Sequence, residues 1–439
     1  MFNGSIIRKY AVLLRLSTVC ALTLLIGGCN FISDPVSLMK APQIAEDKET
    51  LRTTIISQIP EGATLIRSKE EDDTSMIRYV DLNGDGKRET VVFYETTDQS
   101  VLQGAIFENV SGVWQKTVTF EGDGKILDSL KFQDITGDGK VDIIAGFSMG
   151  DEEIQNGLIV YSYTDNGLET VVERPYTQFV ISDLNGDGQL DMTIVSLKKN
   201  ETATITTYQY DNGFVELDKL SLDPFVNSYY NIVAGKVAKD IEGIILDTSV
   251  GSTSAYSLIF VMKDNKLEQV LGQDKTFKDL QIASYDVDHD GVLEIGLLET
   301  PKGWEHIVFD EVPWFFSYYQ WDGESGLTFV RQQYHDLKNR FYLNFFPSEW
   351  HGNITIDIKS NKEKYLKFIM ADTGKTVAEI KFFTLQQWEK EQSDWDLLVR
   401  DNERVIGYKS YNSELELSKN RRTMDSDVAP IERKENKSE

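Results

Sequence analysis

Four short segments of this chain repeat one pattern of oxygen-bearing side chains. Positions 1, 3, 5 and 9 of a nine-residue loop carry a carboxylate, amide or hydroxyl oxygen, and position 6 is glycine. Alternate side chains of such a loop point toward one centre, and the glycine allows the sharp turn that returns position 9 to it. This pattern wraps a hard cation such as Ca²⁺, with position 7 adding its backbone carbonyl. The predicted ligands are Asp81, Asn83, Asp85, Lys87 and Glu89; Asp134, Thr136, Asp138, Lys140 and Asp142; Asp183, Asn185, Asp187, Gln189 and Asp191; and Asp286, Asp288, Asp290, Val292 and Glu294.

An EF-hand is the first kind of calcium site to consider, and the sequence excludes it. An EF-hand requires a bidentate glutamate at position 12 and a helix after the loop. Here the position-12 residues are apolar, and short apolar or β-branched runs typical of strands flank the loops. Each loop therefore joins two predicted strands. The position-12 residues are Val92, Ala145, Ile194 and Leu297.

The loops recur at a nearly constant interval along the chain. Their first aspartates are 53, 49 and 103 residues apart, and 103 is close to twice the other intervals. A further unit is therefore expected near residue 235, where residues 232–246 keep strand-like flanks but lack the acids, with Lys239 placed at the third acidic ligand. Turns favour Asp, Asn and Gly without any metal. Four copies in period, each with an acid at position 9, favour the metal interpretation.

The spacing also predicts the architecture. A period of about 50 residues with four strands per unit is typical of a β-propeller, whose blades are small sheets. The loops resemble the FG-GAP or VCBS-type repeats of integrin-like β-propellers, over residues 61–335. This resemblance implies a mainly β fold with up to four structural Ca²⁺ ions. The departures are the ligand-free unit, Thr136 in place of Asn or Asp, and only five detected units, with six or seven blades left open.

Residues 1–29 have the features of a bacterial lipoprotein signal peptide. Three basic residues precede an apolar run over residues 16–26, and two glycines and Cys29 follow. The ending resembles a lipobox, which implies a lipidated Cys29 at the mature N-terminus. A membrane-spanning anchor is the alternative, but the apolar run of 11 residues is too short to cross a bilayer. We therefore expect an extracytoplasmic protein, held by its lipid at the outer face of the bacterial cell membrane.

Cysteine content and charge limit the chemistry of the mature protein. Cys20 and Cys29 are the only cysteines, so the domain beyond the signal peptide has no disulfide and depends on its core and on metal. The net charge is −26, and removing residues 1–28 leaves 42 basic against 71 acidic side chains, a net charge of −29. This charge argues against nucleic acid as a partner. Thirteen of the acidic side chains are predicted calcium ligands.

The remaining segments divide the chain further. Residues 30–60 are predicted to form a tether and a short helix over 46–59, which Pro60 ends. Residues 336–412 are predicted to form a separate small α+β domain in which Thr384 caps a short helix. Residues 413–439 are polar and charged, so disorder is expected there.

An aromatic cluster lies near the end of the propeller segment. It could form a platform for sugar rings or a protein contact, but we favour core and interface packing, because aromatic side chains are mostly buried. The cluster consists of Trp304, Trp314, Phe315, Phe316, Tyr318, Tyr319 and Trp321.

The sequence contains no convincing catalytic motif. Ser148 matches the centre of a nucleophile elbow, but a strand instead of the required helix is predicted after it. We therefore expect a monomeric binding or scaffolding module of the bacterial envelope, whose partner is a protein or a polysaccharide. The alternative is a polysaccharide hydrolase with a carboxylate pair in the propeller channel, which requires two carboxylates roughly 5–10 Å apart.

Overall fold

The computed structural model describes residues 46–69, 75–97, 100–150, 156–164, 167–345, 348–412 and 415–418. It divides into two compact units, Met1–Ile59 and Pro60–Glu439. The predicted signal peptide, the lipidation site Cys29 and the tether up to residue 45 lie outside the described residues. In the part that is described, no helix has the length and apolar character needed to cross a membrane.

The first unit contains helix α3, Glu46–Gln58, where the sequence predicts one. Leu51 and Ile55, four residues apart on one face, are buried, while Ile56 is exposed. The N–H of Ile59 still donates to the carbonyl of Ile55 at 3.0 Å. Pro60 then ends the helix, because the residue before a proline is disfavoured in the helical region.

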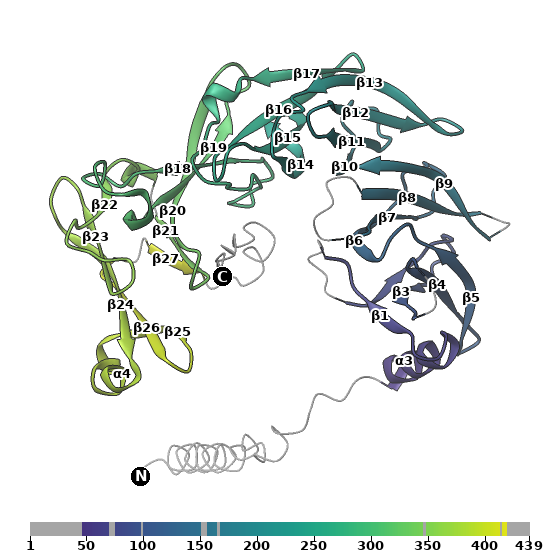
Figure 1. Cartoon of the computed structure of the whole chain (residues 1–439), viewed down its shortest axis with the longest axis horizontal. Coiled ribbons are helices and arrows are strands. Elements are labelled where there is room, and N and C mark those ends of the chain that lie inside the picture. The colour runs from purple at the N-terminus through teal and green to yellow at the C-terminus, as the bar shows by residue number, and fades with distance from the viewer. Residues whose placement is uncertain are drawn as a thin grey trace, which may run out of the picture. The chain divides into compact units, whose positions relative to one another are not determined.

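The second unit is mainly β, and five of its sheets follow one another along the chain as antiparallel meanders (Figure 1). Each has four consecutive strands, and in the first sheet the opening strand is split into two pieces that both pair with β3. This up-and-down order is that of a propeller blade. The strands are β1 (Thr64–Ile66), β2 (Ile77–Val80), β3 (Glu89–Glu95), β4 (Gln103–Val110) and β5 (Val113–Glu121); β6 (Ile126–Gln133), β7 (Asp142–Ser148), β8 (Asn156–Thr164) and β9 (Gly167–Tyr176); β10 (Gln178–Ser182), β11 (Asp191–Lys198), β12 (Thr202–Tyr210) and β13 (Phe214–Leu222); β14 (Ser228–Ala238), β15 (Ile241–Ser249), β16 (Ala255–Lys263) and β17 (Lys266–Leu271); and β18 (Ile295–Glu299), β19 (Phe315–Trp321), β20 (Leu327–Asp336) and β21 (Phe341–Phe345).

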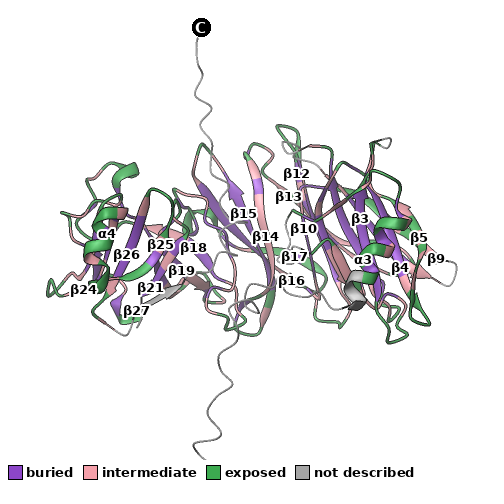
Figure 2. Ribbon diagram, turned by 90° about the horizontal axis from the view of Figure 1, so that it is seen from below, coloured by how far each residue is buried: buried purple, intermediate pink, exposed green. Residues whose placement is uncertain are grey.

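Successive sheets pack face to face through apolar side chains. Strands such as β3 and β15 are therefore buried on both faces, and Figure 2 shows them in purple. The outer strand β5 instead alternates between exposed and half-buried residues. Since a strand covered on both faces needs apolar residues throughout, this packing explains the continuous apolar runs after the calcium-type loops. Shared clusters include Phe93 with Phe147, Ile144 with Ile194, Val195 with Ile244, and Ile245 with Ile295.

The unit without ligands forms the fourth sheet, but it contains no loop. A two-residue turn joins β14 to β15, with Ala238 paired to Ile241 and Asp240 in a left-handed conformation (φ 61°). Lys239 lies exposed in this turn. Placing Lys239 at an acidic-ligand position is therefore wrong, because the nine-residue loop has been replaced by a hairpin turn.

The fifth sheet extends past residue 335, the boundary predicted for the propeller. β21 pairs with β20, and β27 (Leu415–Ser418) pairs with β21 as a fifth strand. The sequence predicts disorder over 413–439, and residues 415–418 depart from that prediction. Their Leu-Glu-Leu-Ser alternation fits a strand, but composition alone gives no sign of the β21 edge with which they pair.

The C-terminal sheet is the small α+β part expected from the sequence. Its strand order is β22-β23-β24-β26-β25, and helix α4 (Leu385–Glu391) lies between β24 and β25 in the chain. Thr384 caps α4 as predicted, accepting from the N–H of Gln387, whose side chain bonds back to the N–H of Thr384. The predicted fold class, four-stranded blades plus a small α+β part, is thus confirmed. The strands are β22 (Ile354–Ile356), β23 (Tyr365–Met370), β24 (Thr376–Thr384), β25 (Asp396–Arg400) and β26 (Arg404–Ser410), and single 3₁₀ turns lie at Gln273–Lys275, Phe309–Glu311, Ser348–Trp350 and Gln392–Asp394.

Candidate metal centres

The position-1 aspartate organises the backbone of each loop. Its Oδ2 accepts a hydrogen bond from the N–H of the position-6 glycine at 2.9–3.0 Å in all four loops. In the first three loops its Oδ1 also accepts from the N–H at position 4, at 2.7–2.8 Å. The four loops therefore share one core of hydrogen bonds. The aspartates are Asp81, Asp134, Asp183 and Asp286.

Positions 4 and 6 both adopt the left-handed backbone conformation. At position 6 the glycines have φ of 82–88°, as the sequence analysis expects for a sharp turn. Position 4 has φ of 71–76° at the glycines of the first three loops and 62° at His289 in the fourth. Glycine at position 4 is thus a second local signal of this loop, since other residues adopt φ > 0 at a cost.

Positions 3, 5 and 7 complete the turn. The position-5 aspartate accepts from the N–H of position 7 at 2.7–2.9 Å in every loop. The donors are Lys87, Lys140, Gln189 and Val292, the residues predicted to offer backbone carbonyls. At position 3, the side-chain oxygens of Asn83 and Asn185 accept from the N–H of position 5, at 2.9 and 3.0 Å.

The position-9 acid lies at the start of the strand after the loop, or next to it, and is buried in all four loops. The exposed fraction is 3% at Glu89, 0% at Asp142, 1% at Asp191 and 0% at Glu294. Each of these carboxylates accepts from the N–H of position 2 at 2.7–2.9 Å. The loop is thereby closed on itself, and a carboxylate is held beneath it.

Burial makes these carboxylates difficult to ionise without a nearby cation. It raises the pKa of Glu294 to about 7, and the neighbouring charges of Asp288 and Asp290 add to the effect. It raises the pKa of Asp191 to about 6, with Asp187 and Asp183 adding to the effect. Burial likewise raises the pKa of Glu89 and Asp142. A bound cation would stabilise the ionised form of all four groups.

The loops differ in how closely their acids converge. Across the described residues, only the fourth loop places three or more potential ligand side chains of the carboxylate, histidine or cysteine type within 4.8 Å of one another. Its group comprises Asp286, Asp288, Asp290 and Glu294. Oδ1 of Asp288 is buried and has no hydrogen-bond partner, so the group has an oxygen available for a cation.

The third loop also carries an oxygen without a partner. Oδ1 of Asp191 is buried in the same way, although the group around it is smaller. In the second loop the hydroxyl of Thr136 instead donates to Oδ1 of Asp142 at 3.4 Å. This oxygen of the position-9 acid therefore already has a hydrogen-bond partner. The donors of the fourth loop therefore fit a hard divalent cation best, followed by those of the third.

The strand opposite position 9 contributes polar side chains that the sequence analysis did not identify. Gln320 in β19 donates through Nε2 to Asp290 at 3.0 Å and to Glu294 at 2.7 Å. Gln209 in β12 donates to Asp187 at 2.7 Å, and Gln209 pairs in register with Asp191. Both glutamines hold loop carboxylates in place. Gln209 could have been located by counting back from the short turn that joins β11 to β12, because that turn fixes the register of the two strands. Residues 300–314 separate β18 from β19, so no hairpin turn fixes the register that places Gln320.

The fourth loop is tied to the sheet that lacks a loop. The N–H of Leu293 donates to the carbonyl of Lys236 at 2.7 Å, and Lys236 forms a parallel bridge with Val292. Arg331 of β20 donates to the carbonyl of Val287 at 3.1 Å. The fourth sheet thus supports a candidate metal loop without having such a loop of its own.

The other features singled out in the sequence have structural roles. Ser148 is the buried last residue of strand β7, and among the described residues from 149 to 164 the next regular element is strand β8, so the nucleophile-elbow geometry is absent there. In the aromatic cluster, the packing interpretation is confirmed for Trp304, Phe315, Phe316, Tyr318 and Trp321, which are 1–6% exposed. Trp314 and Tyr319 are half-buried.

Comparisons with known proteins give only distant likenesses. No family model matches the chain, and no curated protein matches it. Among solved structures, Sqt1 of Chaetomium thermophilum aligns over 78% of this chain and 97% of its own, with 10% identity and a TM-score of 0.32. The Nup133 β-propeller domain of Vanderwaltozyma polyspora aligns over 78% and 84%, with 11% identity and a TM-score of 0.28. A protein from Lactobacillus plantarum aligns over 72% and 93%, with 8% identity and a TM-score of 0.29. Likenesses of this size carry no argument about the function of this chain.

Proposed function

We propose that this chain is a calcium-binding lipoprotein of the FG-GAP/VCBS type, anchored through Cys29 to the outer face of the bacterial cell membrane. It acts there as a binding or scaffolding module of the envelope. The observation that carries the calcium assignment is the fourth loop, where four carboxylates converge and the buried Oδ1 of Asp288 has no partner. Neighbouring carboxylates repel one another by about 1 kcal/mol per pair at ~4 Å even in water. A bound cation would offset the repulsion among these carboxylates.

Calcium, when bound, supplies the positive charge that offsets this repulsion. The chain's own residues keep the donors in place: Glu294 lies next to the first residue of β18, and Gln320 holds it from the neighbouring strand. Binding at the loop would therefore fix the entry to the fifth sheet relative to the fourth, since Leu293 is hydrogen-bonded to Lys236. This supports a structural role for the ion.

The binding role is supported by the chemistry that the described residues offer. Ser148, the one residue with a nucleophile-like sequence context, is buried within a strand, so it does not support an enzyme. A strongly acidic chain with an implied lipid anchor suits a partner other than nucleic acid, such as an envelope protein or polysaccharide. The monomeric state expected from the sequence remains part of the proposal.

The calcium assignment is tested on the full chain in detergent. We expect EDTA to lower the melting temperature and millimolar calcium to restore it, because extracellular sites of this type often have a Kd of about 10⁻⁴–10⁻³ M. Native mass spectrometry should show at most four ions, since a two-residue turn replaces the loop in the fourth sheet. A melting curve indifferent to both EDTA and calcium would refute the assignment.

The anchor is tested separately. Cys29→Ser should move the protein from the detergent phase to the aqueous phase, because the lipid on Cys29 is its proposed attachment to the membrane. Cys20→Ser, which changes the other cysteine, is the matched control and should leave partitioning unchanged. Unaltered partitioning of Cys29→Ser would contradict the lipoprotein assignment.

A further inference from the structure

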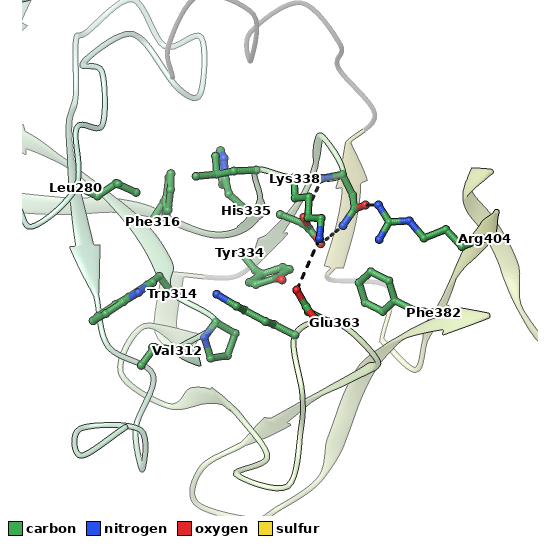
Figure 3. Close-up of a pocket in the computed structure, with 15 residues that line it drawn as sticks. Leu280, Val312, Trp314, Phe316, Tyr334, His335, Lys338, Glu363, Phe382 and Arg404 are labelled. Carbon is green, nitrogen blue, oxygen red and sulfur yellow. Dashed lines mark hydrogen bonds and ion pairs between the residues drawn. The ribbon is translucent and has the colours of Figure 1, made fainter. Parts of the chain in front are cut away.

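A cavity of about 270 Å³ lies where the fifth sheet meets the C-terminal sheet (Figure 3). None of its lining residues belongs to a metal loop. They come from Leu280, from residues 312–314 before β19, from β19 and β20, from the turn before β21, from the loop that precedes β23, and from β24 and β26. The volume is close to the lower end of the range for small-molecule sites, which begins near 300 Å³. A ligand with a single ring is the size that fits.

Flat, neutral rings form one side of the cavity. Trp314 donates through Nε1 to the carbonyl of Phe309 at 3.0 Å and packs on the Phe309 ring at 4.8 Å, which fixes its orientation. Phe316 and His335 stack with their ring centroids 4.4 Å apart. Burial lowers the pKa of His335 to about 3, so its ring is uncharged near neutral pH. Tyr334 also lines the cavity and is buried.

A fixed guanidinium lies opposite these rings, on the C-terminal sheet. Arg404 donates through Nη2 to Oδ1 of Asn339 at 2.6 Å, and its Nε lies 3.3 Å from Asp401. The neighbouring carboxylate of Asp336 accepts from the N–H and the amide of Asn339, at 2.9 and 2.8 Å. Asn339 thus holds the acid on one side and the guanidinium on the other. Nη1 of Arg404 makes no hydrogen bond to the described residues, so it can donate to a ligand.

Two lysines complete the lining. Lys338 and Glu363 form an exposed ion pair of 3.6 Å between the turn before β21 and the loop before β23 (Figure 3). Lys362 lies beside Glu363 in the chain, and no hydrogen bond or ion pair joins its side chain to the described residues. The lining therefore has more cationic than anionic side chains, in a chain whose net charge is −26. Since Lys338 pairs with Glu363 and Arg404 lies beside Asp401, Lys362 is the cation of the lining that no described acid pairs with, and its charge favours an anionic ligand.

We propose that this cavity binds an acidic sugar, a single pyranose ring that carries a carboxylate. The C–H face of such a ring packs on aromatic side chains, and a guanidinium binds a carboxylate through charge-assisted hydrogen bonds. The inference deepens the binding role proposed above and rests on it, but it does not depend on the metal loops. The sugar can be a free uronic acid or the terminal unit of an envelope polysaccharide.

The test uses the full chain in detergent with calcium present, and glucuronate as the probe in isothermal titration calorimetry. We expect a Kd in the millimolar range, the affinity typical of a ligand of about 13 non-hydrogen atoms. Glucose, which has the same ring without the carboxylate, should bind at least tenfold more weakly. An oligosaccharide ending in glucuronate that binds more tightly than the free sugar would identify the polymer as the source, and the reverse order would identify the free sugar.

Variants locate the binding. Arg404→Gln and Trp314→Ala should each weaken glucuronate binding by roughly tenfold, equivalent to about 1.4 kcal/mol. Because Arg404 holds several contacts, Lys362→Gln serves as a second charge variant, and it should weaken binding without lowering the melting temperature. Lys375→Gln removes an exposed lysine outside the cavity and is the matched control, with no expected change.

Three results would overturn the assignment: equal affinity for glucose and glucuronate, glucuronate binding that survives both Trp314→Ala and Lys362→Gln, or no saturable binding. The melting curve separates this failure from that of the calcium assignment. If the melting temperature responds to calcium but not to glucuronate, only the sugar-site proposal is overturned. If the chain binds glucuronate but its melting temperature does not change with calcium, only the metal assignment is overturned.

Discussion

Lys278 and Asp247 form an ion pair from which solvent is excluded: their charged atoms lie 3.0 Å apart, and both side chains are fully buried. Asp247 also accepts from the hydroxyl of Ser257 at 2.5 Å and from the N–H of Ser284 at 2.7 Å. Ser284 lies two residues before Asp286, the first predicted ligand of the fourth loop. The sheet without a loop of its own therefore anchors the entry to the candidate metal loop that follows it.

The first prediction concerns this pair. Lys278→Met should destabilise the fold by about 3–5 kcal/mol, because removing one partner leaves a buried charge uncompensated. Replacing both residues, as Lys278→Met with Asp247→Leu, should recover part of that loss. Urea unfolding in calcium-containing buffer measures both variants. A surface ion pair contributes at most about 1 kcal/mol to stability. If Lys278→Met lowers the free energy of unfolding by no more than this, the prediction is contradicted.

The second prediction ranks the candidate metal loops. Asp290→Ala should remove more of the calcium-induced rise in melting temperature than Asp138→Ala, because Asp290 belongs to the group of four converging carboxylates. A site saturated at a hundredfold excess over Kd stabilises the fold by about 2.7 kcal/mol, so the difference is measurable. Differential scanning calorimetry with and without calcium provides the readout. Equal losses from the two matched variants would refute the ranking but not the metal assignment.

The third prediction concerns position 4 of the loops. His289 has φ of 62° where the third loop has Gly186 at 76°. The left-handed conformation costs a residue with a side chain roughly 1–2 kcal/mol, partly offset because glycine has the more flexible unfolded state. His289→Gly should therefore raise the melting temperature slightly, and Gly186→Ala should lower it. The two opposite substitutions serve as controls for each other, and shifts of the same sign would contradict the account.

The fourth prediction is a pH dependence. Burial lowers the pKa of His335 to about 3, while an unfolded chain has an ordinary histidine pKa near 6.5. The unfolded chain therefore binds this proton first. The stability that depends on a neutral His335 is fully present above about pH 6.5 and is lost as the pH falls toward 3, by up to about 1.4 kcal/mol per pH unit.

His335→Phe tests this dependence because it keeps a ring between Phe316 and Tyr342 without a titrating group. It also removes the 2.5 Å hydrogen bond to Gln333, a loss that stays constant with pH. Relative to the unmodified chain, the variant should gain about 2 kcal/mol between pH 7 and pH 5. Carboxylates elsewhere titrate alike in both proteins and cancel in the difference. A difference in stability that stays constant with pH would show that His335 does not titrate as described.

Local features of the sequence were enough to predict the repeating loops and their strands. Position-1 aspartates and position-6 glycines recur in all four loops because hydrogen bonds within nine residues build each loop. The capping of α4 by Thr384 was equally predictable, since the donor and acceptor lie three residues apart. The regular spacing was enough to predict a fourth unit without ligands.

Tertiary structure alone decided which residues from distant parts of the chain meet. Gln320 contacts Glu294 across 26 residues of sequence, and Lys278 contacts Asp247 across 31. No repeating pattern in the sequence indicates either pair. The pairing of β27 with β21 and the cavity beside Arg404 likewise depend on how separate sheets pack. The sequence by itself determined the loops, the strand runs and the unit spacing, because short-range hydrogen bonds and burial patterns set them. The convergence of four carboxylates in the fourth loop and the charge lining the cavity required the fold, because packing between sheets sets these distances.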